Sequence, residues 1–185
     1  MITIHIDEQG RQQCKDWEQV ILGRSVMKTK NYTGYSATGR YFTGRCGEVA
    51  LRQWAESNNL KFKETSNNQG VSDKQDFIFY FTDGSTRTVD IKNTFIPFEK
   101  LPYLLLAEVQ AKKYKHDLYV GANGIDNGRT VDINLWGLAT WDEMQAAERK
   151  QRKMLSMQIH FKKLRHSMED LARHTEKAED LPEWL

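Results

Sequence analysis

The sequence has little cysteine and no long apolar run, and each shortage excludes a class of protein. Among its 185 residues only Cys14 and Cys46 are cysteines, too few for a disulfide framework or a structural zinc site, and they lack CxxC spacing. No apolar stretch approaches the ~20 residues that span a bilayer, and the first thirty residues lack the apolar region of a signal peptide. These absences predict a cytoplasmic protein without a membrane partner.

Several common catalytic motifs are missing as well. The five histidines show neither HExxH nor zinc-finger spacing, and no glycine-rich segment precedes a Lys-Ser or Lys-Thr pair as in a P-loop. No nucleophile-elbow motif indicates serine catalysis. A functional prediction must therefore come from the acidic residues and from the distribution of charge.

Positive charge is segregated, although the net charge is only +2. Residues 19–47 contain five Lys or Arg and no acid, and residues 149–168 contain seven and again no acid. Segregated positive charge is typical of a polyanion-binding protein, although a basic loop and a solvated helix face give the same pattern. Tyrosines beside the arginines can stack on bases or bond to phosphates. The expected nucleic-acid contacts are Arg24, Lys28, Lys30, Tyr32, Tyr35, Arg40, Arg45, Arg149, Arg152 and Lys153.

Hydrophobic patterning predicts an α/β fold with a mixed central β-sheet flanked by helices. Residues 31–44, interrupted by three glycines, are expected to be a loop. The helices are expected at residues 11–22, 45–57 and 103–114. Short alternating or β-branched runs predict strands at residues 60–65, 76–81, 86–92, 118–121 and 131–136, and the N-terminal MITIHIDEQG alternates like a short strand. Together these elements form a predicted core domain of residues 1–141 with an N-terminal extension.

Residues 142–185 are predicted to be one long basic amphipathic helix ending in an acidic tail. Its apolar residues recur at alternating spacings of three and four, as in a heptad seam: Met154, Met157, Phe161, Leu164, Met168 and Leu171. An exposed seam this apolar must be buried against something. It packs either along its own domain or against a second copy, which makes a homodimer through this helix an open alternative.

Two acids and a lysine are predicted to meet on one hairpin. Asp76 opens the strand at 76–81, Asp90 lies near the end of the strand at 86–92, and Asp83-Gly84 is a strong turn signal between them. Side chains alternate along a strand, so Asp90 and Lys92 share one face.

A cation would relieve the repulsion between carboxylates this close. Hard oxygen ligands favour Mg²⁺, with Mn²⁺ as a substitute. The expected ligands are Asp76, Asp90, the backbone carbonyl of Ile91 and, directly or through water, Glu48. The Asp-x-Lys tripeptide alone is a weak signal, since Glu148-Arg149-Lys150 repeats its pattern without a partner acid.

These residues resemble the motif of the PD-(D/E)XK nuclease superfamily over about half of the chain. The resemblance rests on Glu48 in a helix, Asp76 opening a strand, Asp90-Ile91-Lys92 on the next strand, and Gln110 with Tyr114 in the following helix. Gln75 stands where the family often has proline, and Asp73 is an alternative to Asp76 as the strand-opening ligand. Gln110 and Tyr114 share a helical face and either contact the scissile phosphate, brace Lys92, or form an ordinary half-buried pair.

The resemblance implies a Mg²⁺-dependent DNA endonuclease with Asp76, Asp90, Lys92, Glu48 and Gln110 as its catalytic residues. Two alternatives stay open at this point. One is a structure-specific junction resolvase of the same superfamily. The other is a nucleic-acid-binding module that has a nuclease-like fold but does not cut.

Overall fold

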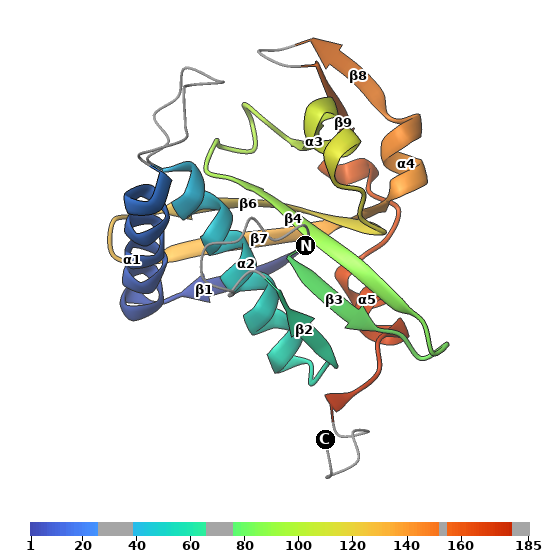
Figure 1. The fold of residues 1–185 in the computed structure, drawn as a ribbon, viewed down its shortest axis with the longest axis horizontal. Helices are drawn as coiled ribbons and strands as arrows, with labels where there is room; N and C mark the ends of the chain where they lie inside the picture. Colours follow the sequence, from blue (N-terminus) through green and yellow to red (C-terminus); the bar gives the residue numbers. More distant parts are fainter. Residues whose placement is uncertain (26–38, 66–75, 152–154, 179–185) are drawn as a thin grey trace.

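The computed structural model describes residues 1–25, 39–65, 76–151 and 155–178, which form an α/β protein around a curled mixed sheet (Figure 1). The larger sheet has the strand order β1-β7-β6-β4-β3-β2. Of its neighbouring strands, β4 and β6 are parallel and the other pairs are antiparallel. The predicted α/β class and mixed sheet are confirmed. The strands of this sheet are β1 (Ile2–Ile6), β2 (Phe62–Glu64), β3 (Phe77–Tyr80), β4 (Thr86–Thr94), β6 (Leu118–Asp126) and β7 (Val131–Thr140).

The β3–β4 hairpin forms where the turn signal predicts it. Gly84 adopts a φ of 79°, which glycine tolerates better than other residues, and Asp83 accepts hydrogen bonds from the backbone and hydroxyl of Ser85. The register places Phe77 opposite Val89, and both are fully buried. This register positions the start of β3 beside the middle of β4.

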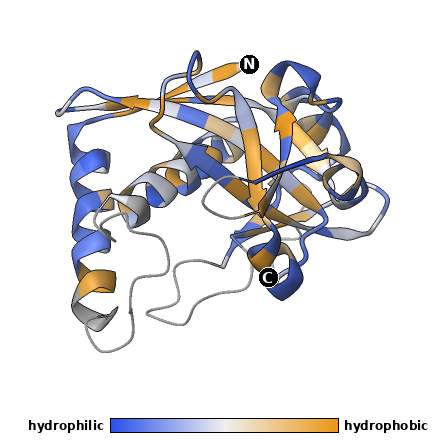
Figure 2. Ribbon diagram, turned by 90° about the horizontal axis from the view of Figure 1, so that it is seen from above, coloured by the Kyte–Doolittle hydropathy of each residue, from blue (hydrophilic) through white to orange (hydrophobic). Residues whose placement is uncertain are grey.

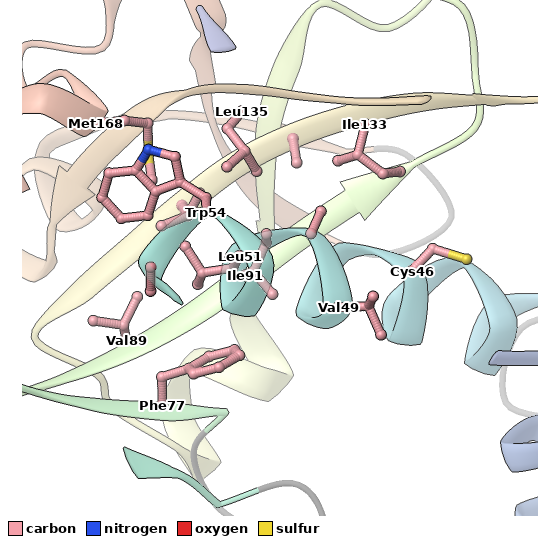
Figure 3. Packing of buried hydrophobic residues seen from close by; sticks show 14 of the residues in the cluster. Cys46, Val49, Leu51, Trp54, Phe77, Val89, Ile91, Ile133, Leu135 and Met168 are labelled. Atoms are coloured by element: carbon pink, nitrogen blue, oxygen red, sulfur yellow. The ribbon is translucent and has the colours of Figure 1, made fainter. Parts of the chain in front are cut away.

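Helix α2 (Arg40–Ser57) covers one face of the sheet and supplies much of the main core. Leu51 and Trp54 are buried against strand residues such as Leu135 (Figure 3). The helix begins at Arg40, so the last residues of the predicted 31–44 loop are helical.

The Glu18 carboxylate of α1 (Glu8–Ser25) accepts hydrogen bonds from the backbone N–H groups of Gly39 and Phe42. That cap comes from a distant part of the sequence. Helix α1, at the left of both whole-molecule views, is largely hydrophilic (Figure 2).

A second, three-stranded sheet has the order β5-β9-β8, from β5 (Tyr103–Ala107), β8 (Glu148–Gln151) and β9 (Leu155–His160). Short helices α3 (Glu108–Lys113) and α4 (Trp141–Ala146) lie beside it (Figure 1). Its core contains Leu104, Leu106, Tyr119 and Met157 among other residues. The helix predicted at 103–114 is therefore wrong in its first half, because residues 103–107 pair with β9 instead.

The predicted long C-terminal helix is wrong. Beyond Thr140 the described residues form α4, β8, β9, a 3₁₀ turn (Phe161–Lys163) and the short helix α5 (Met168–His174). Four apolar residues of the expected seam are buried in two different cores, Met157 and Phe161 in the second core and Met168 and Leu171 in the main core. Met154 lies outside the described residues. The described part of residues 142–185 thus forms no heptad seam. The homodimer stays a prediction. Within the described residues no helix has the length and hydropathy of a membrane span.

Candidate active site

The site begins where β3 separates from β4. Asp76 directly precedes β3, and its Oδ2 accepts a hydrogen bond of 3.0 Å from the backbone N–H of Ile91. In an antiparallel ladder, the N–H and the C=O of one residue point to the same edge of its strand. The carbonyl of Ile91 therefore faces the edge at which Asp76 lies, as the ligand prediction requires.

Asp90 and Lys92 lie on the other face of β4 from Ile91, which packs in the main core. The Lys92 ammonium lies 2.6 Å from Asp90 Oδ2 and donates a hydrogen bond of 2.9 Å to Asp90 Oδ1. The Asp90 side chain is 8% exposed and that of Lys92 is 27% exposed. Asp76 lies close enough to Asp90 for the charge of Asp90 to raise the pKa of Asp76. The structure therefore brings together the two acids and the lysine that the hairpin predicts.

The site confines more negative charge than a buried environment favours. Burial and the nearby charge of Asp90 raise the pKa of Asp76 well above its usual value. Burial by itself lowers the pKa of Lys92, but its ion pair with Asp90 outweighs that effect, and the net pKa of Lys92 is raised. One ammonium faces two carboxyl groups at the junction of β3 and β4, and the raised pKa of Asp76 shows that a second negative charge is disfavoured there without a further cation.

Glu48 lies on α2, a different element from the acid pair. Its charge raises the pKa of Asp76 further. Its Oε2 accepts a hydrogen bond of 2.7 Å from Arg45 one helical turn earlier. Arg45 also donates to Glu64 on β2 at 2.7 Å. The predicted phosphate contact at Arg45 is wrong for this structure, because its guanidinium is buried and bonded to two carboxylates.

Two residues near the acid pair were missed by the sequence analysis. Tyr119 is the register partner of Asp90 on β6, and burial, with a contribution from the charge of Asp90, raises its pKa to about 12. His116 is buried, its pKa is lowered by burial, and its Nδ1 has no hydrogen-bond partner within the described residues. Neither residue belongs to a recognisable motif, since only the parallel pairing of β4 with β6 brings them close.

The predicted Gln110–Tyr114 element is not part of the cluster of acids and lysine. Gln110 lies on α3 and is exposed, and within the described part of the chain its side chain makes no hydrogen bond to Asp76, Asp90 or Lys92. Tyr114 follows the end of α3, with the Lys113 ammonium 4.9 Å from the centre of its ring.

The other predicted nucleic-acid contacts are only partly described. Arg149 lies on the edge strand β8, where its Nε donates a 3.0 Å hydrogen bond to Glu108. Arg24 lies near the end of α1 and Arg40 begins α2, but the positions of their side chains lie outside the described part of the structure. Six further predicted residues lie entirely outside the described residues: Lys28, Lys30, Tyr32, Tyr35, Arg152 and Lys153, as does the alternative ligand Asp73.

The donor set at the β3–β4 junction fits a hard divalent cation. Asp76 and Asp90 supply two neighbouring carboxyl groups, and the Ile91 carbonyl faces the edge at which Asp76 lies. Oxygen donors of this kind favour Mg²⁺. Over the ranges that the structure describes, however, no three or more His, Cys, Asp or Glu side chains are grouped so that they could hold a metal ion. The third predicted acid, Glu48, is bonded to Arg45 instead.

Comparison of the chain with protein-family models, with curated proteins and with solved structures finds no match. Any function must therefore be argued from the site itself and from the motif that it resembles.

Proposed function

We propose that this chain is a Mg²⁺-dependent DNA endonuclease that hydrolyses phosphodiester bonds with a PD-(D/E)XK-type site. One observation carries the proposal: Asp76, bonded to the backbone N–H of Ile91, lies near Asp90, whose carboxylate is paired with Lys92. Structural ion pairs normally match one acid with one base. A surplus carboxylate in a half-buried cluster is costly, and a divalent cation would offset that cost.

The protein residues have separate roles in this proposal. The carboxylates of Asp76 and Asp90, with the Ile91 carbonyl, would hold Mg²⁺, which supplies Lewis-acid stabilisation of the phosphoryl oxygens and favours ionisation of the attacking water. The ammonium of Lys92 orients that water and offsets the negative charge that develops on the phosphate. Lys92 is suited to this role because Asp90 holds its ammonium beside the acid pair.

The exposed basic residues of the second sheet and its helix support DNA as the substrate. Lys112 on α3, Arg149 and Lys150 on β8, and Lys162 and Lys163 after β9 are all exposed. Phosphate contacts of this kind are independent of sequence and supply much of the affinity for DNA. The second sheet lies against β4 and β6, the strands that carry Asp90 and its partner Tyr119.

A non-cleaving nucleic-acid-binding module is the second candidate. It is favoured by the absence, among the described residues, of a metal-binding group of three side chains. The complete set of Asp76, Asp90 and Lys92 supports the nuclease instead. Calorimetric titration of the protein with Mg²⁺ separates the two, because a binding module with this fold has no need of the ion.

The decisive experiment is cleavage of supercoiled plasmid with Mg²⁺, and with EDTA as the blank. We expect nicked or linear product from the wild type and none from Asp90→Asn or Lys92→Met. Matched controls are Asp142→Asn and Lys100→Met, which change exposed residues of the same types and should cut like the wild type. No cleavage by the wild type, or equal cleavage by Asp90→Asn, would refute the proposal.

A panel of linear, circular, flapped and four-way junction DNAs then defines the substrate. Selective cleavage of the junction would identify a resolvase of the same superfamily. Cleavage of circular DNA establishes endonuclease action, whereas an exonuclease requires a free end.

A further inference from the structure

One face of β4 leads from the candidate site to solvent. Side chains alternate along a strand, so Thr94 lies on the same face as Asp90 and Lys92. Burial decreases along this face, because Asp90 is buried whereas Lys92 and Thr94 are half-buried. Ile96, two residues beyond the end of β4, is 43% exposed, and its backbone N–H donates a 3.1 Å hydrogen bond to Thr94 Oγ1. The site is therefore open to solvent towards the end of β4.

An aromatic cluster lies beside Lys92 on the same face. Gly121 of β6 is the register partner of Lys92, and a Cβ added to Gly121 would lie 2.9 Å from the Phe161 ring. The Phe161 ring stacks on Trp136 at 5.5 Å, and Trp136 stacks on Phe98 at 4.7 Å between ring centres. Phe161 is buried, whereas Trp136 and Phe98 are half-buried. The cluster thus begins one strand away from the lysine of the candidate site.

Asn123 fixes this cluster beside the end of β4. It is the register partner of Thr94, and its Oδ1 accepts a 2.6 Å hydrogen bond from Trp136 Nε1. Two residues further along the same face of β6 lies Ile125, which is 64% exposed. This end of β6, at the left of Figure 1, lies away from the second sheet. We call four residues of this region the apolar patch: Ile96, Phe98, Ile125 and Trp136.

Positive charge borders the apolar patch. Lys162 is exposed, and its ammonium lies 5.8 Å from the centre of the Phe98 ring. The acids beside Ile125 are already paired with bases. These pairs are Asp126 with Arg11, at 2.7 and 2.8 Å, and Asp132 with His5, at 2.7 Å. The patch therefore combines apolar and aromatic side chains with an exposed ammonium.

We propose that the apolar patch binds the unpaired bases of single-stranded DNA next to the bond that the site cuts. A duplex presents mainly phosphates and sugars to a protein, and these bind basic and hydroxyl side chains. An unpaired strand exposes its base faces, which stack on aromatic side chains while lysines bind its phosphates. The inference rests on the proposed nuclease function, because it names the DNA that the site of Asp90 and Lys92 receives.

The test compares the binding of labelled oligothymidine with that of a duplex of the same length, by fluorescence anisotropy in EDTA. We expect the wild type to prefer the single strand. Ile96→Ser and Ile125→Ser should each weaken single-strand binding by about threefold. Phe98→Leu removes a ring but keeps an apolar side chain, and it should weaken single-strand binding by about fivefold or more. Duplex affinity should change by less than about twofold, because it depends on phosphate contacts.

Val109→Ser is the matched control, since Val109 is 68% exposed on α3 and lies outside the apolar patch. It should leave both affinities unchanged. Phe98 also packs against the second core, so a urea titration checks the stability of Phe98→Leu. A general loss of structure weakens the binding of both DNAs, whereas loss of base contacts changes the ratio of the two affinities. The two isoleucines are exposed, and their variants provide the test if Phe98→Leu does not fold.

The outcomes separate this inference from the proposed function. Equal affinity of the wild type for the two DNAs overturns the role of the apolar patch, as does single-strand binding that is unchanged in both isoleucine variants. Neither result affects the plasmid assay, which tests the nuclease by itself. If the isoleucine variants selectively lose single-strand binding but the wild type cuts no DNA, the patch binds single strands and only the nuclease proposal fails.

Discussion

The backbone N–H of Ile91 donates a 3.0 Å hydrogen bond to the Asp76 carboxylate at the point where β3 leaves β4. This bond fills the ladder position that a longer β3 would have occupied. It also holds Asp76 against Asp90, although the two negative charges repel each other. The position of Asp76 is thus a consequence of where β3 begins.

Asp76→Asn should abolish cleavage without weakening the fold. In EDTA, the amide still accepts the Ile91 hydrogen bond and no longer repels Asp90, so the free energy of unfolding should equal or exceed that of the wild type. Asp76→Ala leaves that N–H without a partner and should be less stable than Asp76→Asn by about 1–3 kcal/mol. Urea titrations of the two variants measure the difference, and equal stabilities would show that the bond contributes nothing.

The ion pair of Arg11 with Asp126 predicts a pH-dependent contribution to stability. Arg11 Nε and Nη2 donate to Asp126 Oδ1 and Oδ2 at 2.7 and 2.8 Å, and these bonds lower the pKa of Asp126. A lowered folded-state pKa stabilises the protein above the unfolded pKa of about 4, and this stabilisation is lost as the pH falls through the folded-state value. Arg11→Met should therefore lower the free energy of unfolding by about 1 kcal/mol at pH 7. The difference in stability from the wild type should become smaller near pH 2. A deficit that stays constant in urea titrations across that range would contradict the assignment.

Two glycine substitutions should change stability in opposite directions. A Cβ on Gly121 would lie 2.9 Å from the Phe161 ring and 3.3 Å from Leu104, so Gly121→Ala should destabilise the second core by about 1–3 kcal/mol. Gly44 lies inside α2, where an added Cβ would meet no described atom within 4 Å, so Gly44→Ala should stabilise the protein by about 0.5–1 kcal/mol. Thermal unfolding of both variants is the measurement. Destabilisation by Gly44→Ala would show that this helix turn needs glycine for another reason.

Edge strand β8 should contribute to DNA affinity in a salt-dependent manner. The experiment uses the Asp90→Asn variant, which should not cut DNA. In this background, replacing Arg149 and Lys150 by Ala should make the plot of log binding constant against log salt concentration less steep, by up to about 2 in slope, since each phosphate contact contributes about 0.9. Fluorescence anisotropy with a labelled duplex measures the slope. Arg129→Ala, in the exposed turn between β6 and β7, is the control. An equal change of slope in both variants would exclude a specific role for β8.

The β3–β4 hairpin and its acid pair could be predicted from the sequence because their signals are local. Asp83-Gly84 sets the turn, alternation sets the faces of Asp90 and Lys92, and the register follows within a residue or two. The start of α2 could not be predicted in this way. Its first N–H groups are capped by Glu18, which belongs to another helix.

The C-terminal segment shows the limit of periodicity as a signal. Residues 142–178 contain neither glycine nor proline, and their apolar residues recur at helical spacings. Residues 155–160 nevertheless form a strand, because β5 offers a partner edge with Leu104 and Leu106 facing the same core as Met157. A spacing of three and four does not distinguish a helix from short elements that bury their side chains in two different cores.

By itself, the sequence determined the α/β class, the central hairpin and the convergence of Asp76, Asp90 and Lys92, since each depends on residues close together along the chain. Tertiary structure alone decided the second sheet, the burial of Arg45 between Glu48 and Glu64, and the placement of His116 and Tyr119 near Asp90. These features depend on contacts between distant segments, whose free energy outweighs the weak local preferences on which sequence patterns rest.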